Sequence, residues 1–193
     1  MMGGSHVGNA ATFLIETIFG LYILLVMLRF LLQWARADFY NPVSQFIVKA
    51  TQPPLKPLRK IIPGIGGLDM AALLFMIVLK VVELWLVTGL MGLSLQIGGL
   101  LILSVADLLG LAINVFIFSI LIQVIISWVN PGMYNPVMGL LHSLTEPLLG
   151  PARRVIPPIS GLDLSPIVVI VVLQLASMLM VAPIRDLARP MMM

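Results

Sequence analysis

The sequence contains no cysteine and has few charged residues. Of its 193 residues only 10% are Asp, Glu, Lys or Arg, whereas 60% are hydrophobic. The lack of cysteine excludes disulfide bonds, a thiolate nucleophile, cysteine-ligated metal centres and thioether-linked haem. The shortage of charge excludes a soluble globular domain, in which about a quarter of residues are charged. The composition therefore predicts a membrane protein rather than a soluble enzyme or a nucleic-acid-binding module.

Apolar runs of membrane-spanning length occur four times, near 11–32, 70–90, 108–128 and 165–184. About 20 helical residues cross a hydrocarbon core of about 30 Å. Because lipid offers the backbone no hydrogen-bond partner, each run is predicted to be an α-helix. The segment 91–107 is apolar too, but Gly98, Gly99 and Asp107 argue against a fifth span. We predict an all-α membrane protein with four transmembrane helices and an outer connector lying against the membrane surface.

The distribution of Lys and Arg predicts the orientation in the membrane. The connector 33–69 holds five such residues, the connector 129–164 holds Arg153 and Arg154, and the connector 91–107 holds none. Positive loops stay in the cytoplasm. We therefore expect an inner-membrane protein with both long connectors cytoplasmic and the termini outside, although Arg185 and Arg189 oppose this orientation.

An internal repeat at an offset of 94 residues is the strongest pattern in the chain. Over the 30 ungapped positions from Tyr40 to Asp69, 15 residues are identical to those 94 positions later, and most of these are Pro, Gly, Asn, Asp, Arg or Tyr. Two spans in each copy make the copies parallel, related by an axis along the membrane normal. We predict two repeated helical hairpins, 11–90 and 108–185, each with an amphipathic connector, joined by the outer connector 91–107.

The repeated connector is predicted to contain a short surface helix. Asn before Pro is typical of a helix start, and apolar residues follow at helical spacing. We expect later prolines to end this helix, an Asp to cap the next span, and Trp34, Tyr40, Trp128 and Tyr134 to anchor at headgroup level. The residues assigned to connector shape and capping are Asn41, Pro42, Pro53, Pro63, Asp69, Asn135, Pro136, Pro147, Pro157 and Asp163.

A basic pair recurs in both connectors on an apolar background. Arg59-Lys60 in the first copy corresponds to Arg153-Arg154 in the second. Each basic residue near a membrane surface contributes about 1 kcal/mol of attraction to anionic lipids. These four residues are predicted to form a surface for lipid headgroups or for a partner.

The connector motif resembles the YggT family, also called YlmG, in two tandem copies. The resemblance rests on the NP pair, on T-[QE]-P-x-L-x-P-x-R-[KR]-[IV]-I-P and on G-L-D, and it covers roughly 17–185. It implies roles without a reaction: osmotic-stress tolerance and ion homeostasis, an association with cell division, nucleoid distribution in plastids, and assembly of a cytochrome complex with covalently held haem. The first copy has Gln52 where the second has Glu146, so a negative charge is not required there in both copies.

Arg29, Lys80, Glu83, Gln123 and Gln174 are the polar residues of interest inside the predicted spans, where an isolated charge costs about 2.5 to 3.5 kcal/mol. Lys80 lies in the middle of its span with Glu83 one turn on. An intrahelical ion pair is the favoured interpretation, and a polar coupling site or ion path with Gln174 is the alternative. For Arg29, which corresponds to Gln123, snorkelling or a helix-terminus role is favoured over transport.

The sequence favours a non-enzymatic membrane scaffold or assembly factor whose two connectors form the working surface. The alternative is a small ion channel or transporter with a polar path at Lys80, Glu83, Gln174 and Arg29. No catalytic group, cofactor or metal is predicted, since His6 and His142 fall on opposite sides of the membrane. The expected partners are anionic lipids and an unidentified membrane protein, with a homo-oligomer as a further option and no direct contact to nucleic acid.

Overall fold

The computed structural model describes residues 3–93, 96–129, 135–158 and 163–191. Within these ranges every regular element is helical, apart from one isolated β-bridge between Ile65 and Leu68. Tyr134, predicted to be an anchor, lies outside them. The helices are α1 (Gly3–Trp34), α2 (Pro42–Ile61), α3 (Met70–Leu90), α4 (Ile97–Val129), α5 (Pro136–Val155), α6 (Ser165–Ala176), the π-helix η1 (Ser177–Val181), α7 (Ala182–Ala188) and the 3₁₀-helix η2 (Arg189–Met191).

Four helices are long and apolar enough to cross a membrane. They are His6–Trp34 within α1, all of α3, all of α4, and the continuous run Ser165–Ala188 formed by α6, η1 and α7. The predicted class, an all-α membrane protein with four spans, is therefore confirmed. The π-helical turn precedes Pro183, whose missing N–H interrupts the regular hydrogen-bond ladder.

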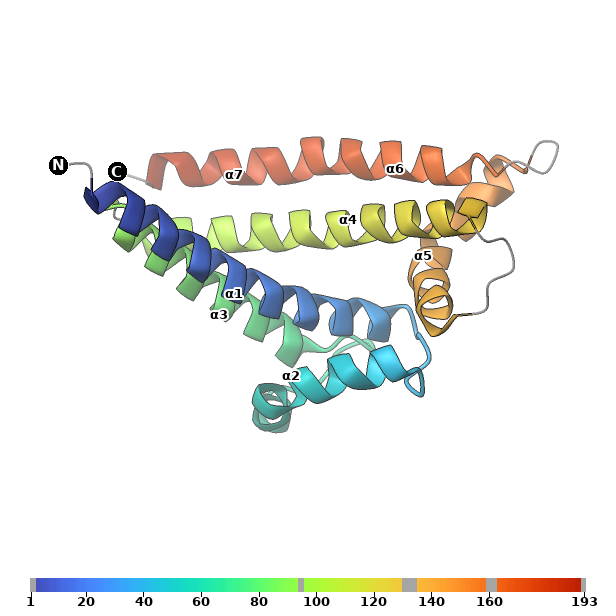
Figure 1. The fold of residues 1–193 in the computed structure, drawn as a ribbon, viewed down its shortest axis with the longest axis horizontal. Coiled ribbons are helices and arrows are strands. Elements are labelled where there is room, and N and C mark those ends of the chain that lie inside the picture. Colours follow the sequence, from blue (N-terminus) through green and yellow to red (C-terminus); the bar gives the residue numbers. More distant parts are fainter. Residues whose placement is uncertain (1–2, 94–95, 130–134, 159–162, 192–193) are drawn as a thin grey trace.

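The spans form two hairpins that lie side by side (Figure 1). In the first hairpin α1 packs along α3, and in the second α4 packs along α6 and α7. Both chain ends lie at one end of the bundle, whereas α2 and α5 lie toward the other (Figure 1). The two connectors therefore share one end, as a parallel duplication requires.

The outer connector is shorter than predicted, because α4 begins at Ile97 and continues through Asp107. The prediction that this segment forms no fifth span is confirmed, but its residues from Ile97 onward extend the third span instead of lying in a connector. At about 1.5 Å per residue, 33 helical residues extend about 50 Å, which exceeds the hydrocarbon core. The carboxylate of Asp107 is accommodated because it faces Lys80 and Arg185 from the other spans.

The connector helices are longer than predicted, because neither ends at its prolines. Pro53, Pro54 and Pro57 lie inside α2, and Pro147 and Pro151 lie inside α5. Proline keeps a helical φ and costs mainly the lost backbone hydrogen bond. Both helices obey the repeat, since 42 + 94 = 136 and 61 + 94 = 155 match their first and last residues.

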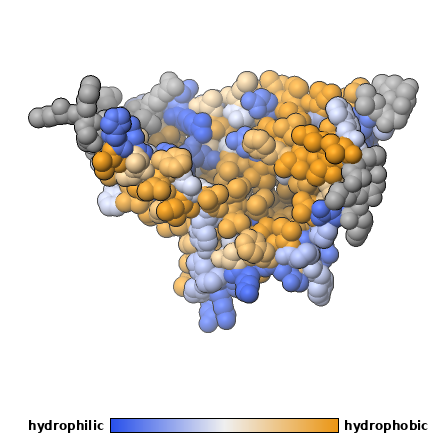
Figure 2. All heavy atoms as spheres, viewed as in Figure 1, coloured by the Kyte–Doolittle hydropathy of each residue, from blue (hydrophilic) through white to orange (hydrophobic). Residues whose placement is uncertain are grey.

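The buried core lies where the first hairpin meets α2 and α4. Val26, Leu55 and Met76 are completely buried there and come from three different helices. A smaller cluster of Ile120, Leu149 and Val169 holds α5 against the second hairpin. Most other span side chains stay exposed and apolar, as expected for surfaces that face lipid. Figure 2 shows this apolar surface, with hydrophilic side chains gathered at the bottom of the view, over α2.

Candidate functional site: the two connector helices

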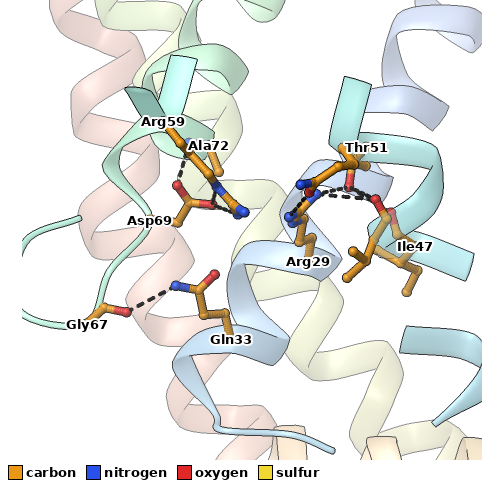
Figure 3. Close-up of polar contacts among 10 residues, drawn as sticks. Arg29, Gln33, Ile47, Thr51, Arg59, Gly67, Asp69 and Ala72 are labelled. Carbon is orange, nitrogen blue, oxygen red and sulfur yellow. Dashed lines mark hydrogen bonds and ion pairs between the residues drawn. The ribbon is translucent and has the colours of Figure 1, made fainter. Parts of the chain in front are cut away.

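An ion pair fixes the C-terminal end of α2 to the start of α3. The guanidinium of Arg59, in the last turn of α2, donates through Nε and Nη2 to Oδ2 of Asp69 (Figure 3). The other oxygen of Asp69 accepts the Ala72 N–H, so that Asp69 also caps α3. The Asp69 side chain is only 5% exposed. The turn between the two helices places Gly66 and Gly67 at positive φ, a conformation that glycine adopts without steric cost.

The same ion pair recurs in the second repeat. Nε of Arg153, near the end of α5, donates to Oδ2 of Asp163 at 2.9 Å. Arg153 also pairs with Glu146 at 2.7 Å. Burial alone would raise the pKa of the Asp163 carboxyl, but hydrogen bonds from Ser165 and Arg153 outweigh it, so that the pKa lies below its ordinary value. The carboxylate therefore stays charged at neutral pH.

A second contact, also repeated, ties the middle of each connector helix to the preceding span. Arg29 Nη1 donates to Oγ1 of Thr51 at 2.8 Å (Figure 3). Arg29 Nη2 donates to Oε1 of Gln52 at 2.6 Å. Arg29 is 4% exposed and Thr51 is completely buried. The expectation that Arg29 snorkels to the surface is wrong, because the polar side chains of α2 supply its partners inside the protein.

In the second repeat a neutral pair replaces this charged contact. Oγ1 of Thr145 lies 2.6 Å from Oε1 of Gln123, the residue that corresponds to Arg29. Thr145 is as deeply buried as Thr51. The positions of Arg29 and Gln52, which bind each other, are occupied in the second repeat by Gln123 and Glu146. Glu146 binds Arg153 instead. The two threonines keep one position while the charges around them are rearranged.

The start of each connector helix is capped by asparagine. Oδ1 of Asn41 accepts the Val43 N–H, and Oδ1 of Asn135 accepts the Val137 N–H. Asn41 also donates through Nδ2 to the carbonyl of Pro136 at 2.6 Å, which links the two connectors directly. Pro42 and Pro136 occupy the first helical turn, whereas Pro63 and Pro157 follow the helix ends.

In each basic pair the first residue forms an ion pair with another described residue and the second does not. Arg59 and Arg153 are bound to the aspartates, and their side chains are 33% and 30% exposed, so the role of the four basic residues in binding headgroups or a partner stays a prediction. Lys60 and Arg154 are exposed. The surface that each connector presents is therefore built on the second residue of the pair, and the first residue positions the helix.

The intramembrane charges form a group contributed by three spans. Nζ of Lys80 lies 2.7 Å from Oε1 of Glu83 in the same helix and 3.6 Å from Oδ2 of Asp107 in α4. Arg185 of α7 binds the other oxygen of Asp107 at 2.8 Å. Asp107 therefore has a basic partner in each of two other spans, whereas Gln174, expected beside Lys80, is exposed on α6.

These charges line a cavity of about 370 Å³ between the hairpins. Glu83 is 4% exposed, and its Oε2 has no hydrogen-bond partner among the described residues. Gly20 and Gly110 leave space on the cavity wall, and Ser177 and Val181 of the π-helix complete it. No group of three metal-ligating side chains with suitable geometry occurs within the described ranges.

The ion pair of Lys80 with Glu83, predicted from their spacing, is confirmed, but the polar contacts between helices could not be located from residue spacing alone. One signal was present, because Thr51, Arg59 and Asp69 all return unchanged at the 94-residue offset. Residues that a duplication preserves together are candidates for mutual contact. Asp107 and Arg185 carried no such signal, since neither has an identical counterpart in the other repeat.

The comparison with family models finds the duplication independently. The model described as CCB3/YggT matches residues 8–90 and again residues 102–184. The chain belongs to the CCB3/YggT family. The two matches are offset by 94 residues, since 8 + 94 = 102 and 90 + 94 = 184.

Relatives in this family are similar over most of the chain. An uncharacterized protein of Pseudomonas aeruginosa is 48% identical over 177 residues, which cover 90% of this chain and 89% of the relative. The uncharacterized protein YggT of Escherichia coli K12 is 40% identical over 173 residues, 88% of each. A chloroplastic Arabidopsis thaliana protein, CCB3, whose name refers to cofactor assembly of complex C, is 33% identical over 78 residues, 39% of this chain and 44% of that protein. No solved structure matches.

Proposed function

We propose that the protein is a non-enzymatic membrane scaffold or assembly factor whose working surface is formed by α2 and α5. The observation that carries this proposal is the double fixation of each connector helix. In both repeats the ion pair and the threonine contact hold the helix against its hairpin, and Asn41 joins the two helices. A surface held so firmly suits recognition of a partner. The name of the Arabidopsis relative supports assembly among the roles implied by the family.

We further propose an inner-membrane location with both connectors in the cytoplasm. The connectors carry most of the Lys and Arg outside the spans, and the residues 91–96 between α3 and α4 carry none. Arg185 counts less against this orientation because Asp107 neutralises it.

Cysteine labelling tests the orientation without background, because the chain has no native cysteine. In intact cells, cysteines at the exposed positions Lys56 and Arg154 should resist a membrane-impermeant maleimide until the inner membrane is opened. A cysteine at the exposed position Leu93 should react at once. The reverse pattern would show that the connectors face outward.

The scaffold proposal is tested at the exposed member of each basic pair. Lys60→Glu together with Arg154→Glu reverses charge at equivalent surface positions and leaves Arg59 and Arg153 bound to their aspartates. We expect loss of the proteins captured from gently solubilised membranes and loss of osmotic-stress survival in a deletion strain, at an unchanged protein level. Unchanged capture and survival would contradict a connector-based function.

A small ion channel or transporter is the second candidate, favoured by the charged cavity between the hairpins. Its unpartnered Glu83 oxygen lies beside Lys80, Asp107 and Arg185 within the spans. This candidate predicts ion flux in liposomes that is lost with Lys80→Leu, whereas the scaffold proposal predicts no flux. For the scaffold, Lys80→Leu with Glu83→Leu should keep cellular function, because removing both members of a buried pair is often neutral.

A further inference from the structure

Three lysines form a single row along α2. Lys49, Lys56 and Lys60 are separated by seven and four residues, which at about 100° per residue places them within an arc of about 40°. All three are exposed, and none makes a hydrogen bond or ion pair with the part of the chain that the structure describes. The sequence from 39 to 68 contains no Asp or Glu. This lysine row is therefore an uncompensated positive charge on one side of the helix.

An apolar groove of about 640 Å³ runs beside the row. It is lined by Gln45, Val48, Gln52 and Pro53 of α2 and by Phe39 from the loop before the helix. Lys49 and Lys56 line the same groove. An apolar groove edged by two cations matches a phospholipid, in which the acyl chains and an anionic phosphate are joined through glycerol.

We infer that this groove binds an anionic phospholipid, with the headgroup phosphate at Lys49 and Lys56 and an acyl chain along Phe39, Val48 and Pro53. The inference rests on the proposed placement of the connectors at the membrane surface and names a ligand for that surface. Lys60 extends the row and attracts the headgroups of neighbouring lipids.

The surroundings of the groove favour lipid over an acidic peptide. Tyr40 is 88% exposed and Phe46 is 64% exposed, which would be unfavourable in water and suits contact with acyl chains. The helix also packs against α1 and α3, toward the end of the bundle away from the chain termini. At the proposed membrane surface, lipid is therefore the most abundant neighbour of the groove. Its phosphate supplies a negative charge for the lysine row, which has no partner among the described residues.

The second connector provides a control within the same molecule. At the 94-residue offset Lys49 corresponds to Ser143 and Lys56 corresponds to Gly150, so neither lysine of the groove is repeated. Glu146 stands where the first connector has Gln52. Only Lys60 has a basic counterpart, Arg154. The lipid site is thus a property of α2 that α5 does not share.

Binding of phosphatidylglycerol to the purified full-length protein tests the inference. Native mass spectrometry in a nonionic detergent compares the wild type with Lys49→Gln, with Lys56→Gln and with the double variant. One kcal/mol per charge corresponds to a loss of affinity of about 5-fold for each variant and about 30-fold for both. The control Ser143→Gln, at the position of α5 that corresponds to Lys49, should bind as the wild type does, and phosphatidylcholine should bind weakly to all variants.

Two results would overturn the inference. One is equal phosphatidylglycerol affinity for the wild type and the double variant. The other is lysine-dependent binding of a soluble polyglutamate peptide without lysine-dependent binding of phosphatidylglycerol, which would assign the row to an acidic protein partner. Because this assay contains no other protein, its failure leaves the scaffold proposal standing. Conversely, loss of captured proteins with Lys60→Glu and Arg154→Glu would support the scaffold proposal whatever the groove binds, because neither residue lines the groove.

Discussion

Arg59→Ala is expected to detach α2 from the first hairpin. The change leaves the carboxylate of Asp69, only 5% exposed, without its counter-ion. Breaking a buried pair from one side costs about 3 to 5 kcal/mol. We expect the lower end, about 3 kcal/mol, because the Arg59 side chain is 33% exposed and water reaches one side of the pair. About 1.4 kcal/mol is tenfold in an equilibrium, so the detached connector should become about 100-fold more populated.

Trypsin digestion in detergent measures this detachment, because Lys49 and Lys60, which are not followed by proline, remain as cleavage sites in α2. When opening is fast, the cleavage rate follows the population of the open form. Arg59→Ala with Asp69→Asn should recover much of the protection, because the amide removes the buried charge and still caps α3. Arg153→Ala should have a smaller effect, because Asp163 is 32% exposed and less dependent on its partner. Equal cleavage of Arg59→Ala and the wild type would show that the ion pair does not hold the connector.

The sequence predicts the class of the fold because hydropathy and repetition are local signals. Four apolar runs and a 94-residue offset are visible without knowledge of any contact. The start of α4 was missed because Asp107 has no local partner, and its compensation by Lys80 and Arg185 exists only once three spans are packed together. The same reasoning applies to the ends of α2 and α5.

The prolines illustrate how tertiary contacts override a local rule. Pro53 removes a backbone hydrogen bond from α2, a cost that by itself predicts a helix end. The helix continues because Leu55, two residues later, is completely buried in the core and because Arg59 then reaches Asp69. Neither contact is local in sequence terms, since Arg59 and Asp69 meet only after the chain reverses at Gly66 and Gly67. In the sequence, only the duplication pointed to Arg59 and Asp69, because both are repeated as Arg153 and Asp163. It did not show that the two residues bind each other.

The threonine contact predicts a difference between the repeats that depends only on charge. Thr51→Val and Thr145→Val remove the same hydroxyl from two completely buried sites with little change in shape. In the first repeat the guanidinium of Arg29 loses a partner at 2.8 Å, and a hydrogen bond to a charged group contributes about 1.5 to 3 kcal/mol. In the second repeat the loss falls on the neutral amide of Gln123, for which about 1 kcal/mol is expected.

Unfolding by SDS in mixed micelles, followed by circular dichroism, compares the two variants. Thr51→Val should lower the free energy of unfolding by about 2 kcal/mol and Thr145→Val by about half of that. Arg29→Met in the Thr51→Val background should restore part of the loss, because it removes the cation that lacks a partner. Arg29→Met alone should cost less than Thr51→Val, since the Thr51 hydroxyl still donates to the Ile47 carbonyl at 2.7 Å. Equal losses for the two threonine variants, with no recovery in the double variant, would mean that the charge of Arg29 plays no part in holding α2 to α1.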